Sequence, residues 1–237
     1  MRNAMLAVLL TCSAHAAMAK DVDIEPGAAQ GAFDAVAEDL IAAIDYKAVG
    51  PAEATGVAGF GVGLVTTYVP VDDAEWSNVT GSDFSAVGMV GLQVTKGLPF
   101  DIDVGAFYAT APGSNVDVIG GEVRYAILEG STVSPALALR ASYVTVSGID
   151  DFDLDSMSFD VSVSKGFGPF TPYGGVGYVK GSADPDPSFG LDEAEVSDTK
   201  LFAGARLTLG LIEFTPQFDQ IGDVSSYSLR MGFSFGL

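Results

Sequence analysis

The sequence predicts an all-β fold, an up-and-down antiparallel β-barrel of about ten strands preceded by a short N-terminal amphipathic helix. Three observations lead to this fold class. Apolar and polar residues alternate over ten stretches of about 10 to 14 residues, the pattern of strands whose side chains point to opposite faces. Long or acidic connections follow the odd-numbered stretches, and tight turns follow the even-numbered ones. Aromatic residues recur every 35 to 40 residues, about the length of one hairpin.

Residues 1–19 have the composition of a secretory signal peptide. An arginine precedes an apolar run, and small residues from Ala17 to Ala19 stand where a signal peptidase cleaves, so we expect cleavage before Lys20. The single cysteine, Cys12, and the single histidine, His15, would leave with this segment. A mature chain without them cannot build disulfides, zinc–thiolate sites, cysteine nucleophiles or histidine-based acid–base systems.

Residues 20–55 form an N-terminal extension, in which residues 28–47 are predicted to be one amphipathic helix. Apolar residues recur at helical spacing from Phe33 to Ile44, with acidic residues on the opposite side, and the helix ends before Pro51. Three positions remain open for this helix. It can lie at the periplasmic mouth of a barrel, enter the lumen as a stopper, or stand apart as a periplasmic or interfacial helix.

The barrel is expected over residues 56–237. No stretch after residue 20 has the run of apolar residues that a transmembrane helix requires. Pro216 interrupts the ninth strand, so a bulge or a strand count other than ten remains open, because proline cannot donate to a β-ladder. The expected strands are residues 56–70, 85–97, 100–111, 115–128, 135–148, 156–166, 170–182, 197–210, 211–219 and 225–236.

Charge and apolar content are both high. Apolar residues make up 48% of the chain and the mean hydropathy is +0.34, yet the formal net charge is −20, which becomes −21 when Arg2 leaves with the signal peptide. Disordered acidic chains do not combine such charge with this apolar content. The acidity also excludes nucleic acid as a partner, since phosphate backbones would be repelled.

Charged residues within the strands share the polar face of each strand. All four arginines of the mature chain lie mid-strand on that face, and carboxylates that could neutralise them lie there too. In a soluble barrel the apolar face points inward, whereas in a transmembrane barrel it faces lipid and the charges line the lumen. Aromatic rings and unequal ends favour the transmembrane arrangement. The predicted lumen ion network comprises Asp101, Asp103, Glu122, Arg124, Arg140, Asp160, Lys200, Arg206, Glu213 and Arg230.

Aromatic residues near the ends of the odd strands, together with one at the start of the last strand, predict an interfacial girdle. Amphipathic rings at one height of a closed sheet are typical of the boundary between lipid and water. The predicted girdle comprises Tyr68, Tyr108, Tyr143, Tyr178, Phe218 and Tyr227.

The long connections hold most of the acidic residues. The segment from Asp151 resembles a calcium loop only partly, because Ser156 and Ser162 replace its glycine and its bidentate glutamate, so we predict no metal site. Trp76, in the first long connection, can contact either the membrane interface or a partner. The predicted acidic loop residues are Asp150, Asp151, Asp153, Asp155, Asp184, Asp186, Asp192, Glu193 and Glu195.

Two segments carry a family resemblance. Lys96 to Ala109 (KGLPFDIDVGAFYA) and Gly120 to Gly130 (GGEVRYAILEG) resemble a set of uncharacterised small barrel proteins of the Gram-negative outer membrane. With the signal peptide, the hairpin spacing and the final amphipathic strand, the likeness covers roughly residues 56–237. The resemblance implies a transmembrane barrel without known activity. The chain departs from such barrels in its last residues, because they usually end on an aromatic residue and here Phe235 is followed by a glycine and a leucine.

The predicted function is a non-enzymatic outer-membrane barrel, either structural or a narrow passive channel, without a cofactor. A dense ion network would plug the lumen and a looser one would leave a narrow aqueous path. The alternatives are a surface protein that binds through acidic extracellular loops and a soluble periplasmic barrel that binds a hydrophobic ligand. The expected location is the bacterial outer membrane. The expected partners are outer-membrane lipids, lipopolysaccharide and the barrel-assembly machinery, with small solutes or ions as possible further ones.

Overall fold

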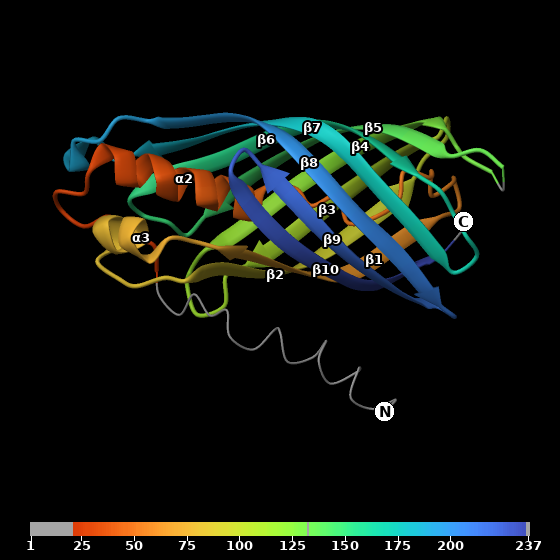
Figure 1. The fold of residues 1–237 in the computed structure, drawn as a ribbon, viewed down its shortest axis with the longest axis horizontal. Coiled ribbons are helices and arrows are strands. Elements are labelled where there is room, and N and C mark those ends of the chain that lie inside the picture. The colour runs from red at the N-terminus through yellow and green to blue at the C-terminus, as the bar shows by residue number, and fades with distance from the viewer. Residues whose placement is uncertain (1–20, 132, 236–237) are drawn as a thin grey trace, which may run out of the picture.

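Ten antiparallel strands close into one barrel in the computed structural model, which describes residues 21–131 and 133–235 (Figure 1). Each strand pairs with its neighbours in the chain, and β1 pairs with β10. The predicted fold class is confirmed. The predicted signal peptide lies outside the described residues. The strands are β1 (Phe60–Pro70), β2 (Ala86–Gly97), β3 (Ile102–Thr110), β4 (Asp117–Leu128), β5 (Ala136–Ser147), β6 (Phe152–Ser164), β7 (Phe170–Pro185), β8 (Ala194–Leu209), β9 (Ile212–Ile221) and β10 (Val224–Phe235).

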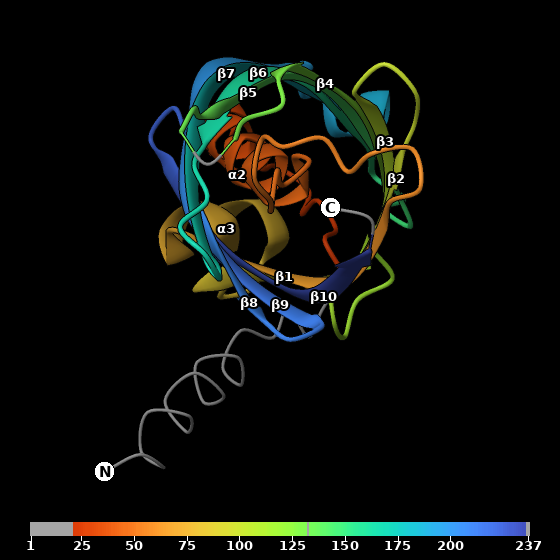
Figure 2. The same ribbon diagram turned by 90° about the vertical axis from the view of Figure 1, so that its right-hand side faces the viewer.

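The seam between β1 and β10 closes the barrel in continuous register. Phe60 pairs with Phe235 at one end of this ladder and Tyr68 pairs with Tyr227 at the other. Closure leaves the sheet without an edge, so its backbone groups find partners within the sheet. Figure 2 looks along the barrel and shows α2 (Gln30–Ile44) inside the ring of strands.

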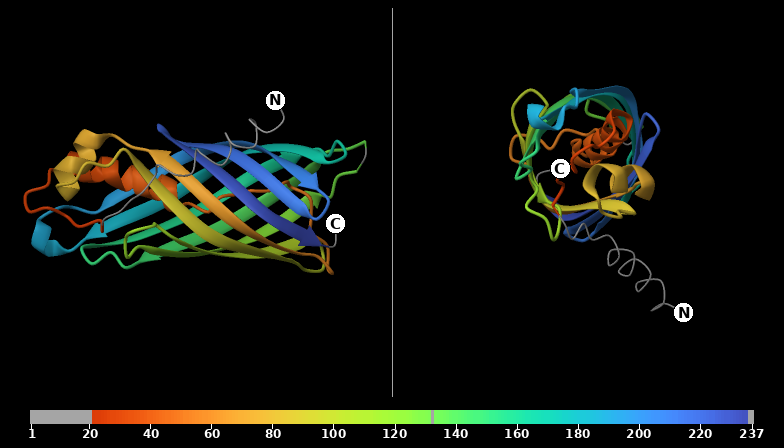
Figure 3. Two further views of the ribbon diagram at one scale, coloured as in Figure 1. Left: turned by 90° about the horizontal axis from the view of Figure 1, so that it is seen from below. Right: turned by 90° about the vertical axis from the view of Figure 1, so that its left-hand side faces the viewer.

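The two ends of the barrel differ in their connections. The turn end carries the short β2–β3, β4–β5, β6–β7 and β8–β9 turns. The loop end carries α3 (Asp73–Thr80), between β1 and β2, and the 3₁₀ helix η1 (Pro187–Phe189), between β7 and β8. Figure 3 shows α3 beside the mouth of the barrel at this end. The sequence does not predict α3, because eight residues are too few to establish a helical repeat of apolar positions.

The outer face of the wall is apolar over a band that begins at the turn end. On β1 the band extends from Phe60 to Tyr68, and on β10 from Phe235 back to Tyr227. Each run has about nine residues, the length with which a tilted strand crosses a bilayer. Nearer the loop end the outward side chains become polar, as at Lys180 of β7. The band therefore stops well before the loop end.

The inner face shows the opposite order. Near the turn end it carries buried polar residues such as Arg124 and Ser162, whereas toward the loop end it carries buried apolar residues such as Leu154 and Val196. The loop-end part is thus apolar inside and polar outside, like a soluble barrel, and the turn-end part is built the other way round. We call the loop-end part, with α2, α3 and the long connections, the cap.

Strands β6, β7 and β8 extend further into the cap than the sequence predicts. Phe152 and Leu154 of β6 are buried facing α2, while the acidic residues that alternate with them point outward. The alternation of inward and outward side chains continues through the cap, but there the outward side chains are the polar ones. An acidic strand segment in the cap therefore has the composition of a loop. Four residues predicted to lie in loops therefore lie in strands: Asp153 and Asp155 in β6, Asp184 in β7 and Glu195 in β8.

Pro216 lies within β9 without changing the number of strands. It is exposed on the outer face and pairs with Leu229 of β10. The ladder between β9 and β8 is interrupted at the proline, which has no N–H to donate, and resumes in the same register at Phe214. Pro216 therefore causes no bulge in this ladder. The barrel keeps the ten strands that the sequence predicts.

Candidate functional site

Residues 21–59, which we call the plug, run through the lumen from the loop end to the turn end. At the loop end the amide of Ile24 donates to Asp151 Oδ2 at 2.7 Å. At the turn end the amide of Thr55 donates to both carboxylate oxygens of Asp103 at 3.1 Å. Of the three positions that the sequence leaves open for the helix, the structure has the one inside the lumen. The helix is shorter than predicted, because the backbone turns extended at Asp45.

Helix α2 fills the apolar part of the lumen within the cap. The rings of Phe33 and Phe152 pack edge to face with centroids 5.8 Å apart, and Ile41 is completely buried. The residues around α2 form one continuous apolar cluster that includes side chains from the plug, α3 and the wall. Burial of apolar surface contributes about 25 cal/mol per Å², so a cluster of this extent fixes the helix firmly in place.

Trp76 of α3 is completely buried beside the plug. Its ring centroid lies 4.9 Å from that of Phe84, and its Nε1 donates to Asp39 Oδ2 of α2 at 2.8 Å. Burial raises the pKa of the Asp39 carboxyl group to about 6, although the hydrogen bond from Trp76 lowers it. Trp76 therefore makes an internal contact, and neither the membrane contact nor the partner contact considered from the sequence is found.

Two lysines hold the plug below the helix. Lys200 of β8 donates to Asp45 Oδ2 at 2.5 Å and to the carbonyl oxygen of Tyr46 at 3.1 Å. Lys47 of the plug donates to the carbonyl oxygen of Ala42 at 2.6 Å and to Ser226 Oγ of β10 at 3.0 Å. All these groups are buried, so each charge depends on its partners to offset the loss of water.

Arginines bind the plug near the turn end. The Arg124 guanidinium forms an ion pair with Asp103, and its Nη1 donates to the carbonyl oxygen of Pro51 at 2.9 Å. Arg206 Nη2 donates to Glu53 Oε2 at 3.1 Å. The plug is thereby tied to strands on different sides of the barrel, in addition to the apolar contacts in the cap.

The wall carries further ion pairs of its own. Arg140 Nε lies 3.1 Å from Glu122 Oε2 and 3.8 Å from Asp160 Oδ1. Arg230 Nη1 donates to Glu213 Oε2 at 3.1 Å. In a low-dielectric lumen such pairs are strongly coupled, and removal of one partner leaves an uncompensated charge.

A cavity of about 50 Å³ remains between the plug and these arginines. Its lining includes Arg124, Arg140, Arg206, Arg230 and Glu122. Nη1 and Nη2 of Arg140 have no hydrogen-bond partner among the described protein atoms. A polar space of this size suits a few water molecules, which would satisfy such donors, but it is too small for an organic solute.

The predicted ion network is mostly brought together inside the lumen, and Asp101 is the exception. Asp101 lies in the β2–β3 turn with φ 60°, so it does not share a strand face with Asp103 as the sequence suggests. Asp45, Lys47 and Glu53 are not among the predicted network residues, because the sequence leaves the position of this segment relative to the barrel open. The alternation of polar and apolar residues shows which strand residues face the lumen. It does not show that a plug residue pairs with a strand some 150 residues away.

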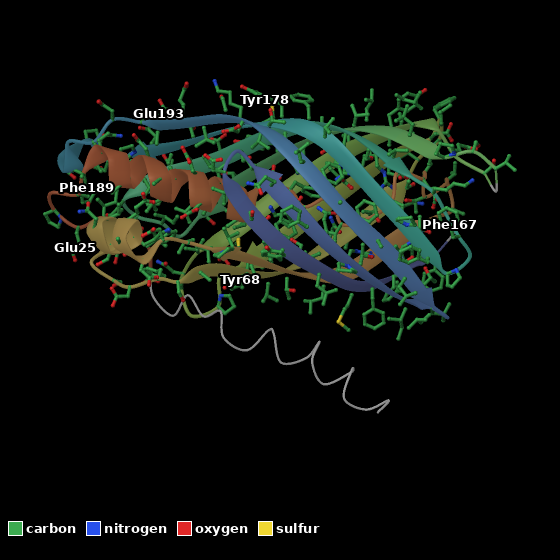
Figure 4. All side chains as sticks on the ribbon, viewed as in Figure 1. Glu25, Tyr68, Phe167, Tyr178, Phe189 and Glu193 are labelled. Atoms are coloured by element: carbon green, nitrogen blue, oxygen red, sulfur yellow. The ribbon has the colours of Figure 1, made fainter. Side chains whose placement is uncertain are left out.

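The predicted girdle residues all lie on the outer face and are exposed. Tyr68, Tyr227 and Phe218 are neighbours in register across β1, β10 and β9, and the rings of Phe218 and Tyr227 lie 5.5 Å apart. Figure 4 shows Tyr68 and Tyr178 on opposite sides of the barrel. On β7, Tyr178 is followed at the next outward position by Lys180, which places the tyrosine at the loop-end limit of the band.

The other predicted acidic residues lie in loop-end connections, namely Asp150, Asp151, Asp186, Asp192 and Glu193. Among the described residues, no group of three or more potential ligands is arranged to hold a metal ion. Likewise, none of the helices in the described part of the chain has the length and apolar character needed to cross a membrane.

Comparisons with known proteins find likenesses among solved structures. No protein-family profile matches the chain, and no curated protein matches it. The KdgM porin is 9% identical, with 73% of this chain and 99% of that chain covered and a TM-score of 0.36. The outer membrane protein OprG from Pseudomonas aeruginosa is 12% identical, with 79% and 100% covered and a TM-score of 0.37. LpxR from Salmonella typhimurium is 12% identical, with 62% and 72% covered and a TM-score of 0.37. At these TM-scores the fold follows from the strand register rather than from the likenesses.

Proposed function

We propose that this protein is a non-enzymatic barrel of the bacterial outer membrane, closed by its own plug, that anchors an acidic cap outside the membrane. The observation that carries this proposal is the continuous contact between the plug and the wall. The plug is bound at the loop end by Asp151, in the middle by Lys200 and at the turn end by Asp103 and Arg206. A lumen occupied at every level supports a structural role.

The membrane location is supported by the outer face. Exposed apolar side chains form a band around the barrel, with aromatic residues at its loop-end limit. Soluble monomers rarely expose continuous apolar patches larger than a few hundred Å². The band is far better suited to lipid chains than to water, and it ends where the wall of the cap becomes polar outside.

The two alternatives that depend on an empty lumen have less support. A narrow passive channel would need a continuous aqueous path, whereas the cavity beside the arginines holds only about 50 Å³. A soluble barrel that carries a hydrophobic ligand would need an apolar interior free for that ligand, whereas α2 fills the apolar part. A catalytic carboxylate pair also lacks support, since Asp103, Glu122 and Glu213 are engaged by arginines and Asp219 accepts a hydrogen bond from Gln217.

The alternative of a surface binding protein is supported by the distribution of charge. Acidic residues crowd the cap, and Lys180 is its one basic residue in the described part of the chain, where it pairs with Glu195 at 3.7 Å. Both side chains of this pair are more than half exposed, so the pair does little to neutralise the surface. A cap of this charge would attract cations and basic partners and would repel anionic solutes.

Planar-bilayer conductance of the purified protein tests the proposal. We expect no single-channel steps from the wild type, because the plug blocks any aqueous path through the lumen. A variant without residues 21–55 is expected to conduct if it folds, and its folding can be followed by the change in gel mobility between heated and unheated samples.

The matched control keeps the plug and removes only one buried charge pair, with Asp45→Asn and Lys200→Met together. This variant should remain silent, because the apolar contacts of α2 are left intact. Regular conductance steps from the wild type would contradict the closed lumen. Failure of the folded protein to fractionate with outer membranes would contradict the location.

A further inference from the structure

The turn end carries a ring of apolar side chains that have few contacts within the protein. Each of its four turns contributes one of them, and we call these the rim residues: Phe100, Val133, Phe167 and Leu211. Phe100 is 85% exposed and Val133 is 91% exposed, which is more than any apolar residue on the wall. Figure 4 places Phe167 at the end of the barrel opposite Glu25, Phe189 and Glu193.

The local structure of the turns does not explain these residues. A single exposed apolar side chain is ordinary, but one in each of four turns leaves the stabilisation of burial unused four times. Phe100 has φ 67°, in the left-handed region that favours glycine, so this turn would form more readily without a bulky residue there. An apolar partner outside the protein would account for the apolar character of the rim.

The turn end carries two carboxylates, Asp101 and Glu129, and two lysines that already have partners within the protein. Lys96 Nζ donates to the carbonyl oxygens of Val57 at 2.6 Å and Gly59 at 3.0 Å. Lys165 Nζ donates to the carbonyl oxygens of Ser131 at 2.8 Å and Ser134 at 3.2 Å. Both lysines are bound by backbone oxygens and lie between the turns, as lysines do where their apolar stems lie along a membrane and their heads reach its interface.

The rim is continuous with the band. Phe60 and Phe235 stack at the turn-end limit of the wall with centroids 5.2 Å apart. Leu209 and Ile212, on either side of the β8–β9 turn, are exposed and join the band to Leu211. At the loop end, by contrast, several polar positions separate the band from the tips of the connections.

We propose that the four turns insert into the lipid interface of the adjoining leaflet, with the rim residues as anchors. This inference rests on the proposed membrane location. It means that the barrel is placed asymmetrically, with its turns inside the membrane boundary and its cap standing clear of the opposite surface. The partner of the rim is therefore the lipid surface itself, and interfacial insertion of such side chains is the familiar use of exposed Phe and Leu near membranes.

Site-directed spin labelling tests this inference with little risk to folding, since the chain has no cysteine after residue 20. Single cysteines are placed at Val133 and Phe167 of the rim in a Cys12→Ser background. Leu92→Cys, on the outer wall of the band, and Glu193→Cys, in the cap, are the matched controls. Each labelled protein is reconstituted in phosphatidylethanolamine–phosphatidylglycerol vesicles. Collisions of the label with oxygen, which concentrates in lipid, are then compared with collisions with a water-soluble nickel chelate.

We expect the oxygen-to-nickel collision ratio at residues 133 and 167 to be several-fold higher than at residue 193, and to approach that at residue 92. A ratio at both rim positions equal to that at residue 193, with a high ratio at residue 92, would overturn the rim inference and leave the membrane location intact. A low ratio at residue 92 as well would overturn both.

Discussion

Asp39 is a plug residue within the cap whose pKa is raised by its surroundings. It lies on α2, accepts the hydrogen bond from Trp76, and has a pKa raised to about 6 by burial. In the unfolded chain its pKa is that of an ordinary aspartate, 3.8. The folded cap therefore binds this proton more tightly than the unfolded chain does, and the free energy of unfolding falls as the pH rises from about 4 to above 6.

We predict that Asp39→Asn removes this part of the pH dependence. Asparagine keeps an oxygen that accepts from Trp76 Nε1 but carries no charge at any pH. Trp76 is the only tryptophan of the chain, so its fluorescence reports urea unfolding of the cap directly. The wild type should gain stability between pH 7.5 and pH 4.5 relative to Asp39→Asn, whereas Asp83→Asn, at an exposed position, should follow the wild type. Parallel pH curves for the wild type and Asp39→Asn would show that this carboxyl group is not the source.

At the scale of elements, the plug packs closely against the wall where the wall has a glycine. A Cβ atom at Gly105 of β3 would stand 2.7 Å from Tyr46 Oη of the plug and 2.8 Å from Glu122 Cγ. Tyr46 is buried and accepts a hydrogen bond from Gln93 Nε2 at 3.0 Å, so it has little freedom to move. The absence of a side chain at Gly105 leaves the space that Tyr46 of the plug occupies.

We predict that Gly105→Ala lowers the free energy of unfolding by about 1–3 kcal/mol, the usual cost of overfilling a packed interior. Gly121→Ala is the matched control, because Gly121 lies on the adjacent strand, pairs with Ala106 and faces outward. A Cβ atom at Gly121 would stand 3.3 Å from the carbonyl oxygen of Gly105, which is a less severe contact. Unfolding by urea in detergent micelles measures both variants, and equal stability of the two would contradict the close fit at Tyr46.

The elements also show which parts of the fold can be predicted from the sequence. The alternation of apolar and polar residues predicts all ten strands, because the two faces of each strand meet surroundings of different polarity. It predicts the strand ends within the cap poorly, since the polar face moves from inside to outside there, and acidic residues such as Asp153 then resemble a loop. Helix α3 is too short for a periodic signal, although Trp76 marks its buried side.

At the scale of the whole molecule, the charge is divided between the two ends. Most described acidic residues lie in the cap, while the arginines lie in the lumen and two lysines lie at the turn end. The arginine-rich wall is predictable from its strand pattern. The contacts of the plug, such as Asp45 with Lys200, are not, because they depend on which segment the barrel encloses.

We predict that an oligolysine peptide binds the reconstituted protein and that its affinity falls steeply as salt is raised from about 50 to 200 mM, over which the Debye length shortens. A variant with Asp184, Asp186 and Asp192 changed to asparagine and Glu193 to glutamine should bind several-fold more weakly. Lumen variants such as Asp45→Asn with Lys200→Met should bind as the wild type does. Affinity that does not respond to salt or to the cap substitutions would contradict electrostatic recognition by the cap. Isothermal titration calorimetry measures these affinities.

The seam between β1 and β10 has a consequence for how the molecule is assembled. The plug precedes β1 in the chain and β10 follows β9, so pairing of β1 with β10 encloses a segment that was synthesised before the wall. A helix about 10 Å wide with its side chains cannot thread into a lumen already sealed around other contents. We expect the plug to lie against the nascent sheet before closure, so that the closed wall then slows its release. Retention of the plug is then a matter of kinetics as well as of affinity.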